Sequence, residues 1–236
     1  MVARKLDADN LQQPAEEGSE GARQTRGEAT KMLLIHAAEN LFAEKGLENV
    51  AIRAIILAAE QKNESVLQYH FGSKAGLIQA IHRYRSAQID ETRRKIQAEL
   101  VKTNAVLTLR EVAVIMIGPA FRLAAADQGF VNYLKVFGPL MALADENLEQ
   151  RLGRQRKAGI AELKLLLRAH RRQLDDEMLE LQLDHAARFA SLALSHQARA
   201  GKGFVGKQAK FFFENLLDNL MAILSVEVST ETRRAR

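Results

Sequence analysis

Residues 51–74 read AIRAIILAAEQKNESVLQYHFGSK, and this stretch decides how the rest of the chain is interpreted. We expect one short helix over 51–59 and a second over about 63–70. Three polar residues separate the two segments: Glu60, Gln61 and Lys62. Two short helices joined by a tight polar turn predict a helix-turn-helix unit.

Longer helices are expected on both sides of this unit. Before it, Thr25 and Glu28 have the spacing of a helix-initiating capping box, and Gly46 is the expected stop. Between them, apolar residues recur at helical spacing: Met32, Ile35, Ala38, Leu41 and Phe42. After the unit, Ser73 is placed to cap a long helix that runs to about Lys102.

The composition of the 236 residues supports an all-α fold. Only 3 Pro and 14 Gly interrupt a chain rich in Ala, Leu, Glu, Lys, Arg and Gln, which are strong helix formers. The absence of Cys excludes disulfides and thiolate metal sites and favours a cytoplasmic location. No apolar run approaches the roughly 20 residues that span a bilayer, so no membrane partner is expected. A net charge of +5 permits nucleic-acid binding without arguing for it.

Polar residues occupy the positions that read DNA in a helix-turn-helix unit, where the second helix lies in the major groove. The candidates for base contacts are Lys62, Asn63, Glu64, Ser65 and Gln68. Asn and Gln bond bidentately to adenine, whereas a Glu accepts from cytosine but repels phosphates. Phosphate contacts are expected from Arg53, Tyr69, His70, Ser73 and Lys74. The alternative is that Tyr69 and Phe71 are core aromatics and Asn63 is only a helix cap.

The run QYHFGSK at 68–74, followed by Leu77, resembles the hallmark Y-x-H-F-x-S-K-x-x-L of tetracycline-repressor-type (TetR) regulators. The preceding AIRAI at 51–55 and the alanine pair that follows resemble the supporting helix of that family. The resemblance covers about 30–77. Glu60 stands where the family usually has a turn glycine, Ala51 replaces a capping Thr, and the turn is one residue longer, which puts the turn geometry in question.

This resemblance implies a three-helix DNA-binding domain followed by a larger helical domain for effector binding and dimerisation. The expected divisions are a flexible arm at 1–24, the DNA-binding domain at 25–75, the effector and dimerisation domain at 76–228, and a basic tail at 229–236. It further implies a homodimeric repressor that binds a palindromic operator in double-stranded DNA. A small-molecule effector of unknown identity is expected, with no cofactor and no enzymatic activity.

An effector cavity is expected among the middle helices, where Gly118-Pro119 and Gly138-Pro139 would kink or break helices or form turns. The candidate lining residues, for which ordinary core packing is the alternative, are Met116, Phe121, Phe130, Tyr133, Phe137 and Met141.

The last two helices, about 176–199 and 204–226, are apolar on more than one face and are expected to form a dimeric four-helix bundle. The candidate interface residues are Phe189, Phe212, Phe213, Leu216, Leu217 and Leu220. A basic run at 151–172 and an acidic run at 175–184 predict two neighbouring helices with complementary charged faces, in preference to an anion-binding surface.

Two other functions stay open. A helical-bundle enzyme would need a metal or cofactor, yet the six His are dispersed and the GKGFVGK run at 201–207 lacks the Ser or Thr of a phosphate-binding loop. A helical ligand-binding protein with lost or weakened DNA binding is the second, because of Glu60 and Glu64.

Overall fold

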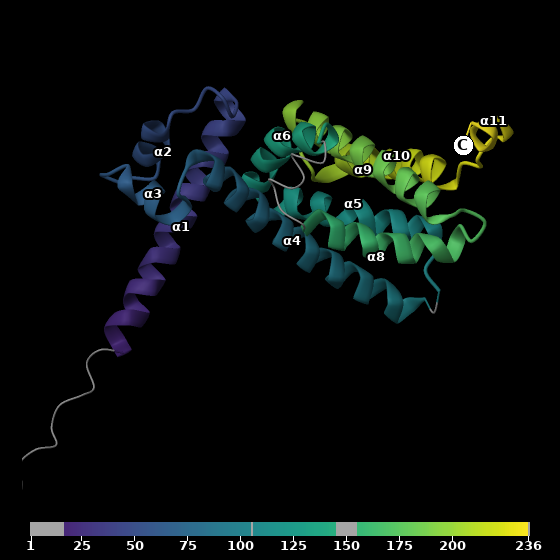
Figure 1. Cartoon of the computed structure of the whole chain (residues 1–236), viewed down its shortest axis with the longest axis horizontal. Coiled ribbons are helices and arrows are strands. Elements are labelled where there is room, and N and C mark those ends of the chain that lie inside the picture. The colour runs from purple at the N-terminus through teal and green to yellow at the C-terminus, as the bar shows by residue number, and fades with distance from the viewer. Residues whose placement is uncertain (1–16, 105, 145–154, 236) are drawn as a thin grey trace, which may run out of the picture.

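The computed structural model describes residues 17–104, 106–144 and 155–235, and it is helical as the sequence predicts. Its helices are α1 (Glu17–Lys45), α2 (Ile52–Ala58), α3 (Ser65–Phe71), α4 (Lys74–Thr103), α5 (Leu109–Ala126), α6 (Gln128–Ala142), α8 (Gln155–His170), α9 (Asp176–Arg199), α10 (Gly206–Ser225) and α11 (Thr230–Arg234). Figure 1 shows a small unit of α1, α2 and α3 beside a larger bundle, with α4 running from one to the other.

Helix α1 begins at Glu17, so the prediction of a flexible arm up to residue 24 is wrong for 17–24, and residues 1–16 lie outside the described part. Thr25 and Glu28 therefore lie inside the helix and do not start it. Glu, Ala, Arg and Gln between 17 and 24 favour a helix by intrinsic propensity, whereas apolar periodicity is needed only where a helix packs. The stop is confirmed, because Gly46 follows with φ of 83°.

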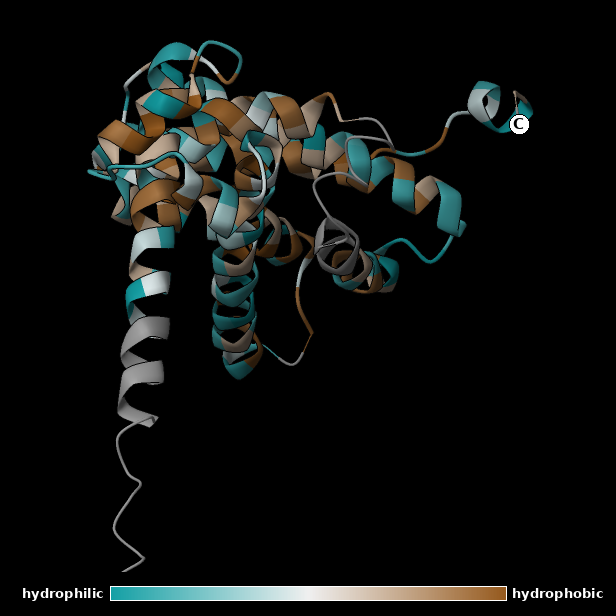
Figure 2. Cartoon of the chain, turned by 60° about the vertical axis from the view of Figure 1, so that its left-hand side comes forward, coloured by the Kyte–Doolittle hydropathy of each residue, from teal (hydrophilic) through white to brown (hydrophobic). Residues whose placement is uncertain are grey.

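The small unit packs α2 and α3 against the C-terminal half of α1 and the start of α4. Its core contains Leu34, Phe42, Ile55 and Leu67, each at most 2% exposed. Figure 2 shows hydrophobic residues gathered where these helices meet. Both short helices of the helix-turn-helix prediction are confirmed, as is the cap of α4, because the Ser73 hydroxyl accepts from the Gly76 amide at 3.0 Å.

The turn between α2 and α3 keeps its shape although it lacks the usual glycine. Glu60 adopts a φ of 56°, in the left-handed region that favours glycine. Its amide donates to the Leu57 carbonyl at 3.0 Å, and the next amide, of Gln61, donates to the Ile56 carbonyl at 2.9 Å. These two bonds close a Schellman-type helix end. The departure at Glu60 is therefore accommodated by backbone strain at one residue.

Neither Gly-Pro pair breaks a helix, which corrects the sequence interpretation: Pro119 lies inside α5 and Pro139 inside α6. The glycines instead allow close packing. A Cβ on Gly138 would come within 2.6 Å of the Ser195 Cβ, so α6 meets α9 almost backbone to backbone. A Cβ on Gly118 would lie 3.2 Å from the tip of Ile96 on α4.

The two opposite charge runs face each other, as predicted, in the described part of the chain. Lys164 on α8 lies 2.6 Å from a Glu180 oxygen and 3.1 Å from an Asp176 oxygen on α9. Arg168 also pairs with Asp176. Because the acids are well exposed, these pairs orient the two helices and add little stability.

Candidate DNA-binding surface and internal cavity

Helix α3 has two chemically different faces. Leu67 is 1% exposed and packs into the core of the small unit, while Tyr69 is 84% exposed and Gln68 is also exposed. Phe71 packs partly against the core, so of the two aromatics only this one fits the core interpretation. One face of α3 therefore packs into the core, and the other face exposes polar groups to solvent.

The residues that precede α3 divide between capping and exposure. The Asn63 side-chain oxygen accepts from the Ser65 amide at 2.9 Å, so Asn63 is a cap whose own amide N–H groups remain for other partners. Lys62, Glu64 and Ser65 are exposed beside it. All the candidate base-contacting residues therefore lie on α3 or within three residues before it.

The candidates for phosphate contacts lie around α3, and they differ in their exposure and in the contacts that they already make. Arg53 is exposed near the start of α2. His70 is half-buried beside α1, because a Cβ on Gly27 would lie 3.9 Å from its ring. The Lys74 ammonium donates to the Leu47 carbonyl at 2.6 Å and lies 5.8 Å from the centre of the Phe42 ring. Lys74 therefore ties the chain after α1 to the start of α4, with two N–H groups left over.

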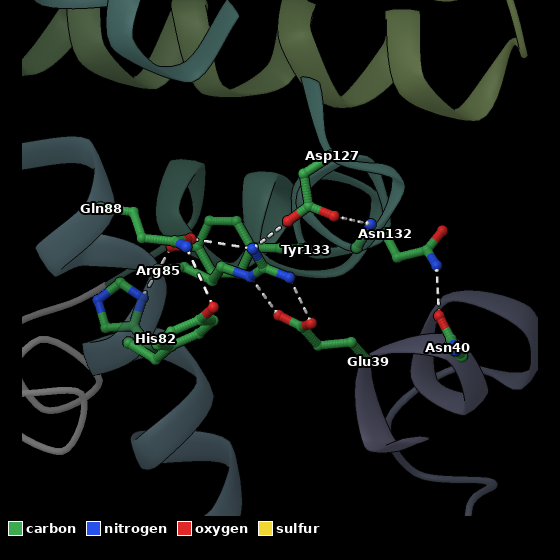
Figure 3. Close-up of polar contacts among 10 residues, drawn as sticks. Glu39, Asn40, His82, Arg85, Gln88, Asp127, Asn132 and Tyr133 are labelled. Carbon is green, nitrogen blue, oxygen red and sulfur yellow. Dashed lines mark hydrogen bonds and ion pairs between the residues drawn. The ribbon is translucent and has the colours of Figure 1, made fainter. Parts of the chain in front are cut away.

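A buried ion network joins the small unit to the larger bundle, and Figure 3 shows it. Arg85 of α4 donates two parallel hydrogen bonds of 2.6 Å each to Glu39 of α1. Its third nitrogen donates to Asp127, the cap of α6, at 2.5 Å and to Gln88 at 2.9 Å. The Arg85 and Glu39 side chains are each 1% exposed. Three helices are thus fixed through one guanidinium.

Burial and charge act against each other in this network. Burial opposes the charged form of Asp127, but the hydrogen bond and positive charge of Arg85 outweigh it and hold the pKa of this carboxyl below its ordinary value. Burial also opposes the charge of Arg85, and its bonds to Glu39 and Asp127 outweigh that effect and raise the pKa of the guanidinium. Arg85 therefore stays charged at every relevant pH.

A second polar contact lies one turn back along α4. The Tyr133 hydroxyl of α6 is 3.0 Å from Nδ1 of His82, and both side chains are buried. Burial raises the pKa of the Tyr133 phenol far above its ordinary range, so it keeps its proton and can donate to His82. The His82 ring stacks on Phe137, with centres 5.7 Å apart.

These aromatics form one end of a cavity of about 190 Å³ between α4, α5, α6, α8 and α9. Four of the six predicted lining residues do line it: Met116, Tyr133, Phe137 and Met141. The other two do not, because Phe121 packs on Phe204, Phe212 and Phe213, and Phe130 is fully buried against Tyr133.

The polar wall of the cavity was not predicted from the sequence. This wall comes from α4 and consists of His82, Ser86, Asp90 and Arg93. Their spacing of four, four and three residues places them on one helix face, and that spacing was the available signal.

The predicted interface residues separate into two groups. Leu216, Leu217 and Leu220 of α10 are at most 3% exposed inside the protomer, so they are core residues and inaccessible to a partner. Phe212 and Phe213 are half-buried against Phe121, whereas Phe189 of α9 is 39% exposed. The apolar character of these residues was predicted correctly. Which neighbour the α10 side chains face depends on how α10 packs on α5 and α9.

An exposed stripe along α9 was also missed. It consists of Leu181, His185, Phe189, Leu192 and His196, which share one face by their spacing. Phe211 is 74% exposed on the neighbouring helix α10. Large apolar side chains in solvent on two adjacent helices indicate an interaction surface.

Two other kinds of site were sought in the described residues. No group of three or more His, Cys, Asp or Glu side chains within them could hold a metal ion. None of the described helices is long and apolar enough to cross a membrane.

Comparisons with known proteins agree with this arrangement. Residues 34–81 match the family model of bacterial regulatory proteins of the tetR family. The fatty acid degradation regulator FadR from Bacillus halodurans is similar in structure, with a TM-score of 0.58, 15% identity, and coverage of 83% of this chain and 95% of that one. NalD, the secondary repressor of a multidrug efflux pump in Pseudomonas aeruginosa, has a TM-score of 0.53, 17% identity, and coverage of 84% and 96%. A search of curated proteins finds no match.

The matched segment runs from the second half of α1 through α2 and α3 to the start of α4, and the two solved neighbours share the fold over 83% and 84% of the chain. The fold and this match define a helical DNA-binding protein of transcription regulation. Over residues 34–81 the chain is similar in sequence to the tetR family of bacterial regulatory proteins.

Proposed function

We propose that this protein is a ligand-responsive transcriptional repressor that binds a palindromic operator as a homodimer. The observation that carries the proposal is the polar, exposed face of α3, with Gln68 and Tyr69 in solvent opposite the buried Leu67. A helix held from behind in this way can enter a major groove without rearranging the core. In the proposal Gln68 and the residues from Lys62 to Ser65 contact base edges, while Arg53, Tyr69, His70, Ser73 and Lys74 contact phosphates.

The homodimer is proposed to form through the exposed stripe of α9 and through Phe211 of α10. Two copies of such a surface bury each other about a two-fold axis, and the resulting four-helix bundle sets the distance between the two α3 helices. Two-fold symmetry in the protein requires two related half-sites in the DNA, about 34–36 Å apart.

The cavity is proposed to hold the effector, with no cofactor and no catalytic step. Its polar wall belongs to α4, the same helix that carries Arg85 and that begins at the Ser73 cap directly after α3. A molecule that binds one position of α4 better than another shifts the population of dimers whose α3 helices match the operator. We propose that the effector releases the DNA and that the protein acts in the cytoplasm.

Selection of bound DNA from a random pool by purified protein tests the proposal. We expect a palindrome with half-sites one helical turn apart. Two cationic side chains per protomer, on Arg53 and Lys74, give about four phosphate contacts in a dimer and a slope of log affinity against log salt of about −4. Failure to enrich any sequence would favour a helical ligand-binding protein that has lost operator binding.

Sedimentation of two variants tests the dimer surface. Leu192→Glu places a charge in the proposed α9 interface and should shift the protein toward monomers. Leu165→Glu is the matched control, because Leu165 is 75% exposed on α8, outside the stripe. A monomeric wild-type protein, or the same shift in both variants, would contradict this interface.

A further inference from the structure

The cavity has one polar side and one apolar side. Both of its formally charged lining residues, Asp90 and Arg93, come from α4. The opposite walls are formed mostly by apolar side chains, among them Met116, Leu134 and Leu194. Such a cavity suits a molecule with a single polar head group on an apolar body.

Arg93 is the deeper of the two charges, with a side chain 11% exposed against 38% for Asp90. One terminal nitrogen of its guanidinium donates to an Asp90 oxygen. Its Nε is buried, and among the described residues it has no hydrogen-bond partner. Because a buried charged donor without an acceptor is costly, a ligand that brings an acceptor to Nε gains more than one that brings another donor.

The two ends of the cavity also differ, because Arg93 lies at one end and aromatic rings lie at the other. His82 and Arg93 are eleven residues apart on α4, which corresponds to about 16 Å along the helix axis. At the His82 end the Phe137 ring lies nearly parallel to the imidazole, with an interplanar angle of 12°. An elongated molecule can therefore place its head group at Arg93 and its apolar end toward this ring.

Resting on the proposed function, we propose that the effector of this protein is an elongated apolar carboxylic acid whose carboxylate binds the Arg93 guanidinium. An ammonium compound is disfavoured, because Asp90 is already paired with Arg93 and is partly solvated. Its positive charge would then lie beside the guanidinium.

Calorimetric titration of the full chain with octanoate, octanol and octylamine tests this assignment. The three probes share a length and a tail and differ only in the head group. We expect octanoate to bind about tenfold or more tightly than the other two, since a charge-assisted hydrogen bond contributes at least that factor. Equal binding of the three probes, tighter binding of octylamine, or no binding of octanoate would overturn the proposal.

Three variants locate the head group. Arg93→Gln should weaken octanoate binding about tenfold or more. Asp90→Asn should have the opposite effect, because it frees the guanidinium and removes a repelling charge, and this result does not depend on the folding of the first variant. Arg94→Gln is the matched control, since Arg94 is exposed on the same helix, and it should leave binding unchanged. Unaltered octanoate affinity in both Arg93→Gln and Asp90→Asn would contradict a carboxylate at Arg93.

The affinity of the same protein for selected DNA, measured without any probe, separates the two proposals. Octanoate binding without DNA binding would refute the operator-binding function and leave the ligand class intact. DNA binding without octanoate binding would refute only the ligand class.

Discussion

Polar side chains have opposite surroundings in two regions of this molecule. On α3, Gln68 and Tyr69 are exposed on a helix whose other face is buried. At the junction of α1, α4 and α6, Arg85 and Glu39 are buried and are joined by two hydrogen bonds. The exposed groups of α3 are available to another molecule, whereas the buried ion pair fixes the relative positions of the helices. The proposed DNA-binding surface therefore depends on a framework that is held by the buried charges of Arg85 and Glu39.

The largest effect should come from breaking the buried region. Arg85→Ala leaves the Glu39 carboxylate buried without its partner, and we expect a loss of about 3–5 kcal/mol in the free energy of unfolding. Arg83→Ala is the control, because Arg83 is exposed on the same helix, and it should change stability by less than about 0.5 kcal/mol. Urea unfolding followed by circular dichroism measures both. Equal stability of the two variants would show that the network is not structural.

The packing of the larger helical bundle gives the next effect. In Gly138→Ala the new methyl group would meet the Ser195 Cβ and the Ser191 carbonyl, so α6 and α9 must separate. We expect a loss of about 1–3 kcal/mol. In Gly118→Ala the nearest atom is the movable tip of Ile96, so thermal unfolding should show a clearly smaller loss. A Gly138→Ala variant as stable as wild type would contradict the close approach of these helices.

In the turn between α2 and α3, Glu60→Gly should stabilise the protein. Glu60 adopts a positive φ that costs a residue with a Cβ about 1 kcal/mol, and glycine avoids this cost. The two backbone bonds that close the turn do not need the Glu side chain. We expect a gain of about 1 kcal/mol in chemical unfolding with unchanged DNA affinity. A loss of stability would mean that the carboxylate itself holds the turn.

The smallest effect concerns pH. The pKa of Asp127 is lowered in the folded state, so its charge contributes stability above its unfolded pKa, and this contribution is lost as the pH falls through its lower folded pKa. Asp127→Asn keeps a side chain that can cap α6 and removes the charge. The melting temperature of the variant should be lower at pH 7 and should fall less between pH values of about 5 and 3. Parallel pH profiles would contradict a role for this charge.

The sequence predicted the helices of the helix-turn-helix region well, because their signals are local. The helix boundaries around Gly46 and Ser73 follow from side chains and backbone within a few residues. The family match over 34–81 covers the same segment. Which of the polar side chains there contact bases stays a prediction.

The other region was not foreseen, because its partners are distant in sequence. Arg85 bonds to residues 46 and 42 positions away, and no local pattern specifies that meeting. Leu216 and Leu217 are both buried inside the protomer, and because α10 is apolar on more than one face, its sequence did not reveal which face its own neighbours cover. Pro119 was expected to kink or break a helix or to form a turn, whereas α5 continues through it.

The measurement that tests the central claim most directly is the affinity of Gln68→Ala and Arg53→Ala for the selected operator and for single-base variants of it, at several salt concentrations. We expect Gln68→Ala to relax preference at particular base pairs by about 1–3 kcal/mol and to leave the salt slope unchanged. Arg53→Ala should weaken binding to every sequence alike and make the slope shallower by about 2 in a dimer. Equal weakening of all sequences by both variants would contradict base reading by the exposed face of α3.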